Sequence, residues 1–146
     1  MTDTTTRTLT EAEQQILRAV LDTVVPASAD GRMPSAAELD FSAYLAEQAA
    51  AFAASLPEFL AALPSDFASL GVAARSAALE EVAAADPASF DQLIFRVYDC
   101  YYQNDAVRLL IGGEPGPPFP RGNTIPQGDL SSLDAVIARS PGYRRV

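Results

Sequence analysis

Histidine, lysine and tryptophan are missing from this chain of 146 residues, and all ten of its basic residues are arginine. The absence of histidine removes the commonest general base and metal ligand, together with Ser-His and Cys-His nucleophile pairs. The absence of lysine removes Schiff-base chemistry and lysine-dependent phosphate loops. Carboxylates, tyrosines, arginines and one thiol remain. We therefore expect a protein that is not an enzyme by itself, with no catalytic, cofactor-binding or metal-binding residues.

Cysteine and long apolar runs are also scarce. Cys100 is the only cysteine, so an internal disulfide is excluded. On an apolar helix, such a cysteine is typical of a small buried hydrophobe. No apolar run is long enough to span a bilayer, and residues 1–7 lack the basic start and apolar stretch of a signal peptide. We predict no direct membrane insertion and, as the sequence stands, a cytoplasmic protein.

Positive charge is scarce in the first two thirds of the chain. The formal net charge is −9, and residues 1–50 and 51–100 each carry −5, whereas residues 101–146 carry +1. Nucleic-acid binding requires a basic patch that neutralises phosphates. We therefore expect no nucleic-acid partner.

The composition and periodicity predict an all-α fold. The hydrophobic fraction is 49%, and the length suits a single helical domain over residues 1–146. Nothing alternates with period two for long enough to form a strand. We expect an irregular bundle of about five to six helices, with a flexible N-terminus over residues 1–9. An extended Pro/Gly-rich arm over residues 112–129 follows at the C-terminal end.

Capping residues and prolines mark the ends of the first predicted helix. Thr10 and Glu13 have the spacing of a capping box. Apolar residues then recur at helical spacing until Pro26. We predict a helix over residues 11–25, followed by a loop over residues 27–34.

The same signals recur further along the chain. Ser35 and Glu38 repeat the capping-box spacing and predict a long alanine-rich helix that ends at Pro57. Asp86 is a predicted cap, with a proline directly after it. Three further helices are therefore predicted, over residues 58–63, over residues 73–85 and from Pro87 onward.

The last of these helices combines an apolar stripe with a polar-aromatic cluster. The stripe has the spacing i, i+4, i+7 and i+11 and consists of Phe90, Ile94, Val97 and Tyr101. The cluster is connected by i+3 and i+4 relations and includes Tyr98, Tyr101, Tyr102 and Asp105. Three interpretations are open: rings buried at the core edge with bonded hydroxyls, a protein interface, or a catalytic Tyr–Asp pair.

The segment after this helix contains five prolines between Pro115 and Pro126, so it cannot form a helix or a central strand. It also carries Phe119 and Ile125, which are too apolar for a solvated linker. Two interpretations are open. The segment wraps its own bundle, with these side chains filling gaps, or it docks as a preorganised arm on another subunit.

Four stretches of the sequence resemble the gluconate 2-dehydrogenase subunit 3 family. They are Leu9-Thr10-Glu11-Ala12-Glu13 with Leu17 to Pro26, then Asp40-Phe41-Ser42-Ala43-Tyr44-Leu45, then Tyr101-Tyr102-Gln103-Asn104-Asp105-Ala106-Val107, and Leu110-Ile111-Gly112 with the Gly/Pro run to Gly122. The resemblance covers about residues 9–145 in the order of elements.

The resemblance implies an accessory small subunit. Members of that family accompany a large FAD-dependent dehydrogenase of the glucose-methanol-choline type, which acts on sugars, sugar acids or polyols. The small subunit binds no flavin and supports the folding, stability and often the export of the catalytic chain. Family members commonly begin with a twin-arginine signal, from which this sequence departs.

The resulting hypothesis is a non-catalytic small subunit with no cofactor of its own, FAD being expected in the partner. The family supplies no catalytic residues, so only interface residues are predicted: Tyr98, Tyr101, Tyr102, Pro118, Phe119 and Arg121. The alternative is a stand-alone helical ligand-binding or regulatory protein. A closed pocket under Tyr98 and Tyr101 would favour that alternative.

Overall fold

A computed structural model of the chain describes residues 8–113, 115 and 128–139. The chain divides into two compact units, residues 1–116 and 117–146. The single domain predicted over residues 1–146 stays a prediction. Throughout the described residues the regular structure is helical, without a strand, which confirms the predicted all-α fold class.

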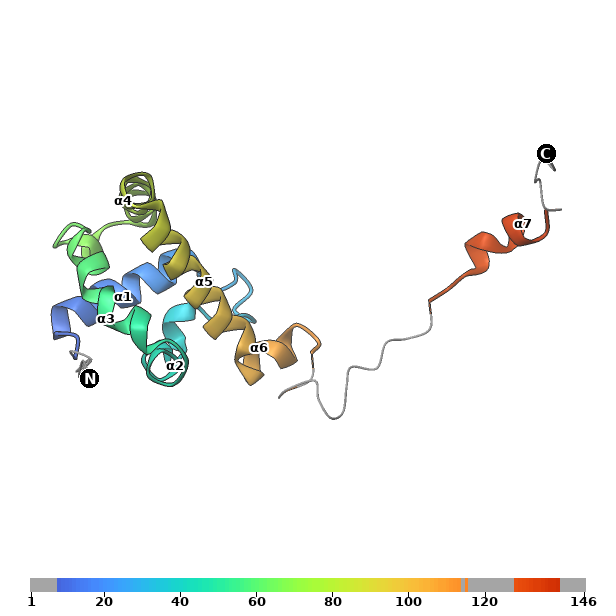
Figure 1. Cartoon of the computed structure of the whole chain (residues 1–146), viewed down its shortest axis with the longest axis horizontal. Helices are drawn as coiled ribbons and strands as arrows, with labels where there is room; N and C mark the ends of the chain where they lie inside the picture. The colour runs from blue at the N-terminus through green and yellow to red at the C-terminus, as the bar shows by residue number, and fades with distance from the viewer. Residues whose placement is uncertain (1–7, 114, 116–127, 140–146) are drawn as a thin grey trace. The chain divides into compact units, whose positions relative to one another are not determined.

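The first unit contains a bundle of six α-helices and two short 3₁₀ turns, η1 and η2 (Figure 1). Helix α1 contacts both turns and helices α3, α4 and α5, so it lies at the centre of the bundle. In chain order the elements are α1 (Glu11–Val24), η1 (Ala36–Glu38), α2 (Phe41–Gln48), α3 (Ala50–Ala61), η2 (Phe67–Ser69), α4 (Val72–Ala85), α5 (Pro87–Gln103) and α6 (Asp105–Leu110). The second unit contains η3 (Ser131–Leu133), which leads into α7 (Asp134–Ile137).

The first helix begins where its capping box predicts. The Glu13 amide donates to Thr10 Oγ1 at 3.3 Å, and the Thr10 amide donates to Glu13 Oε2 at 2.8 Å. Two orphan amides are thereby satisfied at the exposed end of the helix. The helix ends at Val24, one residue short of the prediction.

The hydrophobic core is contributed by every helix of the first unit. Its most deeply buried side chains are Val20, Leu56, Leu60, Phe67, Leu93, Val97 and Val107. Small residues complete it, and Ala19, Ala36 and Ala49 are buried as well. Because alanine occupies little volume, the backbones that carry these residues can approach closely.

The long helix predicted from Ser35 to Pro57 is wrong at its start. Ser35 and Glu38 form the expected capping box, but the chain makes only the turn η1 before Leu39 becomes extended. Asp40 then caps α2 by accepting from the Ala43 amide at 2.9 Å. A second break falls at Ala49, which is buried between α2 and α3. No local signal marks Ala49, so packing overrides its helix propensity here.

The predicted end at Pro57 is also wrong, because α3 continues through the proline to Ala61. Proline removes one backbone hydrogen bond and disfavours a helix interior. Its neighbours Leu56, Phe59 and Leu60 are buried, and their burial offsets that cost. The short helix predicted over residues 58–63 is therefore the last turn of α3.

Candidate protein-interaction surface

Helix α5 is fixed at its start by local signals and on one side by the core. Asp86 accepts from the Ser89 amide at 3.2 Å, and a proline occupies the first turn, as predicted. Three side chains at i, i+4 and i+8 are buried in the core: Leu93, Val97 and Tyr101. Val97 and Tyr101 belong to the predicted stripe, whereas its other two members, Phe90 and Ile94, are only partly buried.

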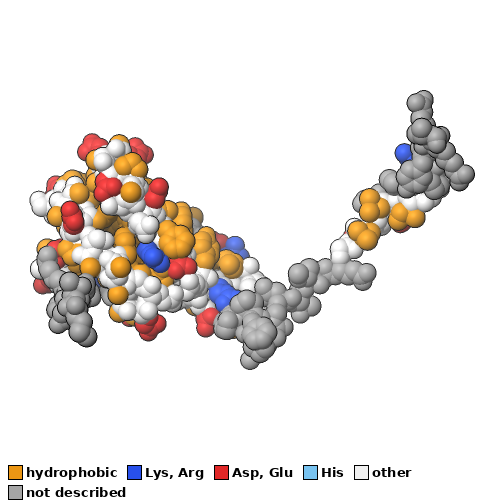
Figure 2. Space-filling model, viewed as in Figure 1, with side chains coloured by type: hydrophobic (Ala, Val, Ile, Leu, Met, Phe, Trp, Pro, Cys, Tyr) orange, Lys and Arg blue, Asp and Glu red, His pale blue; other side chains and the backbone are white. Residues whose placement is uncertain are grey.

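The opposite side of α5 carries a second line of large side chains, here called the α5 stripe: Phe95, Tyr98 and Tyr102. Their exposed fractions are 57%, 43% and 52%. The spacing i, i+3 and i+7 places them on one side of the helix. In Figure 2, hydrophobic side chains lie on the surface along α5. Contiguous apolar surface of this kind marks interaction sites on folded proteins.

Apolar exposure continues along the sequence into α6. Asn104 ends α5 and caps α6, accepting from the Ala106 and Val107 amides at 3.0 and 3.3 Å. Val107 is fully buried and anchors this short helix. The residues that follow are more than half exposed and are here called the α6 end: Leu109, Leu110 and Ile111.

Exposed large apolar residues of the first unit are concentrated on α5 and α6, and this concentration identifies a surface. Within residues 8–113, the large hydrophobic residues that are exposed number seven, and six belong to the α5 stripe and the α6 end. The seventh is Val72, at the start of α4. Apart from Val72, the other helices of this unit therefore cover their large apolar side chains, whereas α5 and α6 leave six of theirs exposed.

Tyr101 supports this surface from inside. It is only 2% exposed, and its hydroxyl donates to the Pro34 carbonyl at 2.8 Å. Its ring meets Tyr102 edge-on, with centroids 5.3 Å apart. Burial, followed by nearby Tyr102 and Glu38, raises the Tyr101 pKa. Tyr101 was predicted among the interface residues, but its ring belongs to this chain's own core and orients an exposed neighbour.

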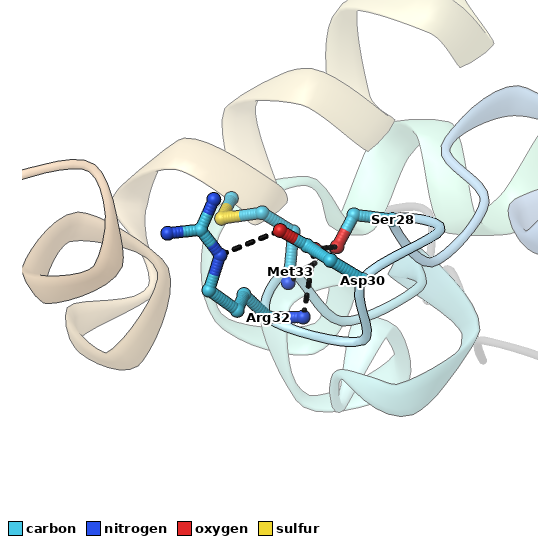
Figure 3. Close-up of polar contacts among 4 residues, drawn as sticks. All are labelled: Ser28, Asp30, Arg32 and Met33. Carbon is cyan, nitrogen blue, oxygen red and sulfur yellow. Dashed lines mark hydrogen bonds and ion pairs between the residues drawn. The ribbon is translucent and has the colours of Figure 1, made fainter.

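The loop that ends at Pro34, whose carbonyl accepts the Tyr101 hydrogen bond, is held by several internal hydrogen bonds (Figure 3). Asp30 accepts from the Ser28 hydroxyl at 2.6 Å and from Arg32 Nε at 2.6 Å. The Met33 amide donates to Ser28 Oγ at 2.8 Å. Gly31 has φ of 70°, a conformation that favours glycine. The loop predicted over residues 27–34 is therefore present, and its internal bonds hold the Pro34 carbonyl beside α5.

A second polar contact fixes α5 against α2. The Tyr44 hydroxyl donates to Asp99 Oδ2 at 2.6 Å, and Gln103 Nε2 donates to Asp99 Oδ1 at 2.5 Å. Burial, followed by the Asp99 hydrogen bond, raises the pKa of Tyr44. Arg96 lies over the Phe95 ring, 5.1 Å from its centroid. The α5 stripe thus projects from a helix held against α2 by a phenol–carboxylate bond, and the cation–π contact lies within α5 itself.

The chemistry of the polar groups near the stripe is not that of an activated site. Burial, and then the charges of Asp99 and Asp40, raise the pKa of Cys100 to about 11, so the thiol form dominates near neutral pH. The raised pKa values of Tyr44 and Tyr101 likewise keep both phenols protonated. Across the described residues, no group of three or more His, Cys, Asp or Glu side chains could hold a metal ion.

Two open grooves of the first unit lie away from the α5 stripe. One, of about 440 Å³, lies between α3 and the junction of α4 with α5 and is lined by residues that include Phe52, Phe59 and Val82. Another, of about 360 Å³, lies beside the start of α1 and is lined by residues that include Leu9, Leu45 and Leu56. Neither groove is lined by a residue of the α5 stripe.

The predicted interface residues separate into three groups. Tyr98 and Tyr102 lie together on the exposed face, with ring centroids 6.2 Å apart. Tyr101 is buried, as described above. Three further predicted residues lie outside the described part of the chain: Pro118, Phe119 and Arg121. The prediction omitted Phe95 and the α6 end, although the spacing of Phe95 with Tyr98 and Tyr102 is a signal for a second stripe.

Comparison of the chain with protein-family models, with curated proteins and with solved structures finds no match. In the part of the chain that the structure describes, no helix combines the length and the apolar character that crossing a membrane requires. The class defined by the fold and the surface is therefore an all-α protein with an exposed aromatic face.

Proposed function

We propose that this chain is a non-catalytic small subunit of a heteromeric FAD-dependent dehydrogenase. The partner is a large subunit of the glucose-methanol-choline type that acts on a sugar or polyol and holds the flavin. The small subunit stabilises this partner and assists its folding. The observation that carries the proposal is the exposed α5 stripe, continued in sequence by the α6 end.

The composition and rigidity of this surface support protein binding. Aromatic residues and arginine are enriched where proteins meet, and they dominate the energetics of such contacts. The stripe combines three aromatic rings with the Arg96 guanidinium. Its Tyr102 ring packs edge-on against the buried Tyr101 ring, and its helix is fixed by the Tyr44–Asp99 bond. A preorganised surface loses little conformational freedom on binding, which favours association.

The identity of the partner rests on the resemblance in residues 9–26, 40–45 and 101–122. Covering the α5 stripe removes apolar area from water on both chains. Because the complex contains the folded large subunit and not its unfolded form, binding stabilises that subunit by mass action.

Co-expression tests the proposal. A glucose-methanol-choline-type dehydrogenase from the same genome is expressed with this chain, with the double variant Tyr98→Asp/Tyr102→Asp, or alone. We expect the double variant to reduce the copurified dehydrogenase at least tenfold, because two charges would enter an apolar interface. Soluble flavin-loaded enzyme and its turnover are measured in each case.

A matched control distinguishes a specific surface from general stickiness. Val72 is exposed and apolar but lies on α4, so Val72→Asp adds the same charge elsewhere. We expect this variant to copurify like the unmodified chain. The proposal is overturned if both variants lower copurification equally, or if the dehydrogenase is as soluble and active without this chain.

A further inference from the structure

The second unit contains an apolar line that the described residues of that unit leave exposed, here called the α7 line: Leu130, Leu133 and Ile137. Their exposed fractions are 64%, 45% and 73%. They stand at i, i+3 and i+7 across η3 and α7, the spacing that places side chains on one side of a helix. Four of the five residues between them are small or polar, namely Ser131, Ser132, Asp134 and Ala135, and the fifth is Val136, so the segment is amphipathic.

Local signals nevertheless build this segment as a helix. The Ser131 amide donates to Asp129 Oδ1 at 2.9 Å, which satisfies an amide at the start. The Leu133 amide donates to the Leu130 carbonyl at 2.8 Å, and the Ala138 amide donates to the Asp134 carbonyl at 2.9 Å. An isolated helix this short is only marginally stable in water. A short amphipathic helix with an uncovered apolar side is typical of helices that dock in a groove by i, i+3 and i+7 anchors.

We propose that the α7 line docks in an apolar groove of the same large partner that covers the α5 stripe. This inference rests on the proposed function and adds a second contact element to it. Three aliphatic side chains do not overcome the cost of bringing two free proteins together. They become effective when the α5 stripe is already bound, because the second contact is then made within one complex.

The chain length between the two elements sets where the groove can lie. Eighteen residues, numbers 112–129, separate Ile111 from Leu130. A chain of that length reaches at most about 60 Å, whatever its conformation. The groove on the partner is therefore within about 60 Å of the position where the α6 end binds.

A second copy of this chain is a poorer occupant than the large partner. Two copies each carry a formal charge of −9, so they repel one another. Three side chains on each copy also cover much less than the roughly 800 Å² per partner of a stable interface. A large partner with a preformed groove is limited neither by this charge repulsion nor by this small buried area.

Substitutions on the two sides of α7 test the inference. The double variant Leu133→Asp/Ile137→Asp places two charges in the α7 line, and we expect the dissociation constant for the large subunit to rise at least tenfold. The control Ala135→Asp adds a charge at an exposed position on the other side of α7, and we expect less than a twofold change. Thermal melting of the free variants should be unchanged, because the core of the first unit contains none of these residues.

Amide hydrogen exchange gives a second readout on the unmodified chain. We expect the amides of Leu133 and Ala138 to exchange at least tenfold more slowly in the complex, because docking stabilises the helix. Unchanged affinity for the double variant, or unchanged exchange in a complex that does form, overturns this inference and leaves the proposed function standing. Absence of any complex with the unmodified chain overturns both.

Discussion

Helices α1 and α5 differ in what their outer sides carry, although both start at a capping residue and both pack in the same core. Helix α1 buries Leu17, Val20 and Leu21, and its exposed side is polar. Helix α5 buries one apolar face and exposes the aromatic α5 stripe on the other. Packing against the core therefore explains the apolar residues of α1. In α5 it explains only the buried face and not the exposed α5 stripe.

The largest expected effect contrasts the two sides of α5 directly. Leu93 is fully buried, so Leu93→Ala should lower the free energy of unfolding by about 2–5 kcal/mol through lost burial and a cavity. Phe95, two residues along, is 57% exposed, and Phe95→Ala should change it by about 0.5 kcal/mol at most. Urea denaturation of both variants measures the difference. Equal losses would mean that Phe95 belongs to this chain's core.

A smaller effect is expected at the contact that holds α5 against α2. Tyr44→Phe removes the hydroxyl that donates to Asp99 and should cost about 1–2 kcal/mol, because the carboxylate loses a partner in a partly buried place. Tyr102→Phe is the matched control, since Tyr102 is half exposed, and it should leave the stability unchanged. If chemical denaturation gives the same stability for both variants, the Asp99 bond does not fix the helix.

The smallest effect concerns the two caps and depends on pH. Helix α1 is capped by the neutral Thr10 side chain, whereas α5 is capped by Asp86, whose pKa is lowered by its hydrogen bonds with Ser89. A lowered folded-state pKa adds stability above the unfolded value of about 3.9, and this stability is lost as the pH falls through the folded pKa. We expect Asp86→Asn to show a weaker loss of thermal stability between about pH 5 and pH 2 than the unmodified chain. Identical pH profiles would contradict this role for the Asp86 charge.

Local chemistry could be predicted from the sequence wherever it does not depend on distant residues. The capping residues Thr10, Ser35 and Asp86 all make the bonds that their spacing predicts. The all-α class follows from the same signals. A cap satisfies amides within three residues of itself, so its effect is set by the nearby sequence alone.

The candidate surface was predictable only in part. The predicted apolar stripe of α5 contained Tyr101, which is buried, yet the interface prediction grouped Tyr101 with the exposed Tyr98 and Tyr102. The difference arises because α5 packs through Leu93 and Val97, which turns Tyr101 inward and its neighbours outward. The prediction assigned no role to Phe95, because its exposure also depends on which face of α5 packs against the core.

The sequence by itself determined that this chain is helical, where α1, α4 and α5 begin, and that its catalytic inventory is small. Tertiary structure decided that the chain breaks at Ala49, that α3 continues through Pro57, and which side of α5 stays uncovered. Helix starts are decided by bonds between near neighbours. The side that is buried depends on residues far away in the chain, because apolar area is removed from water only when a second element covers it.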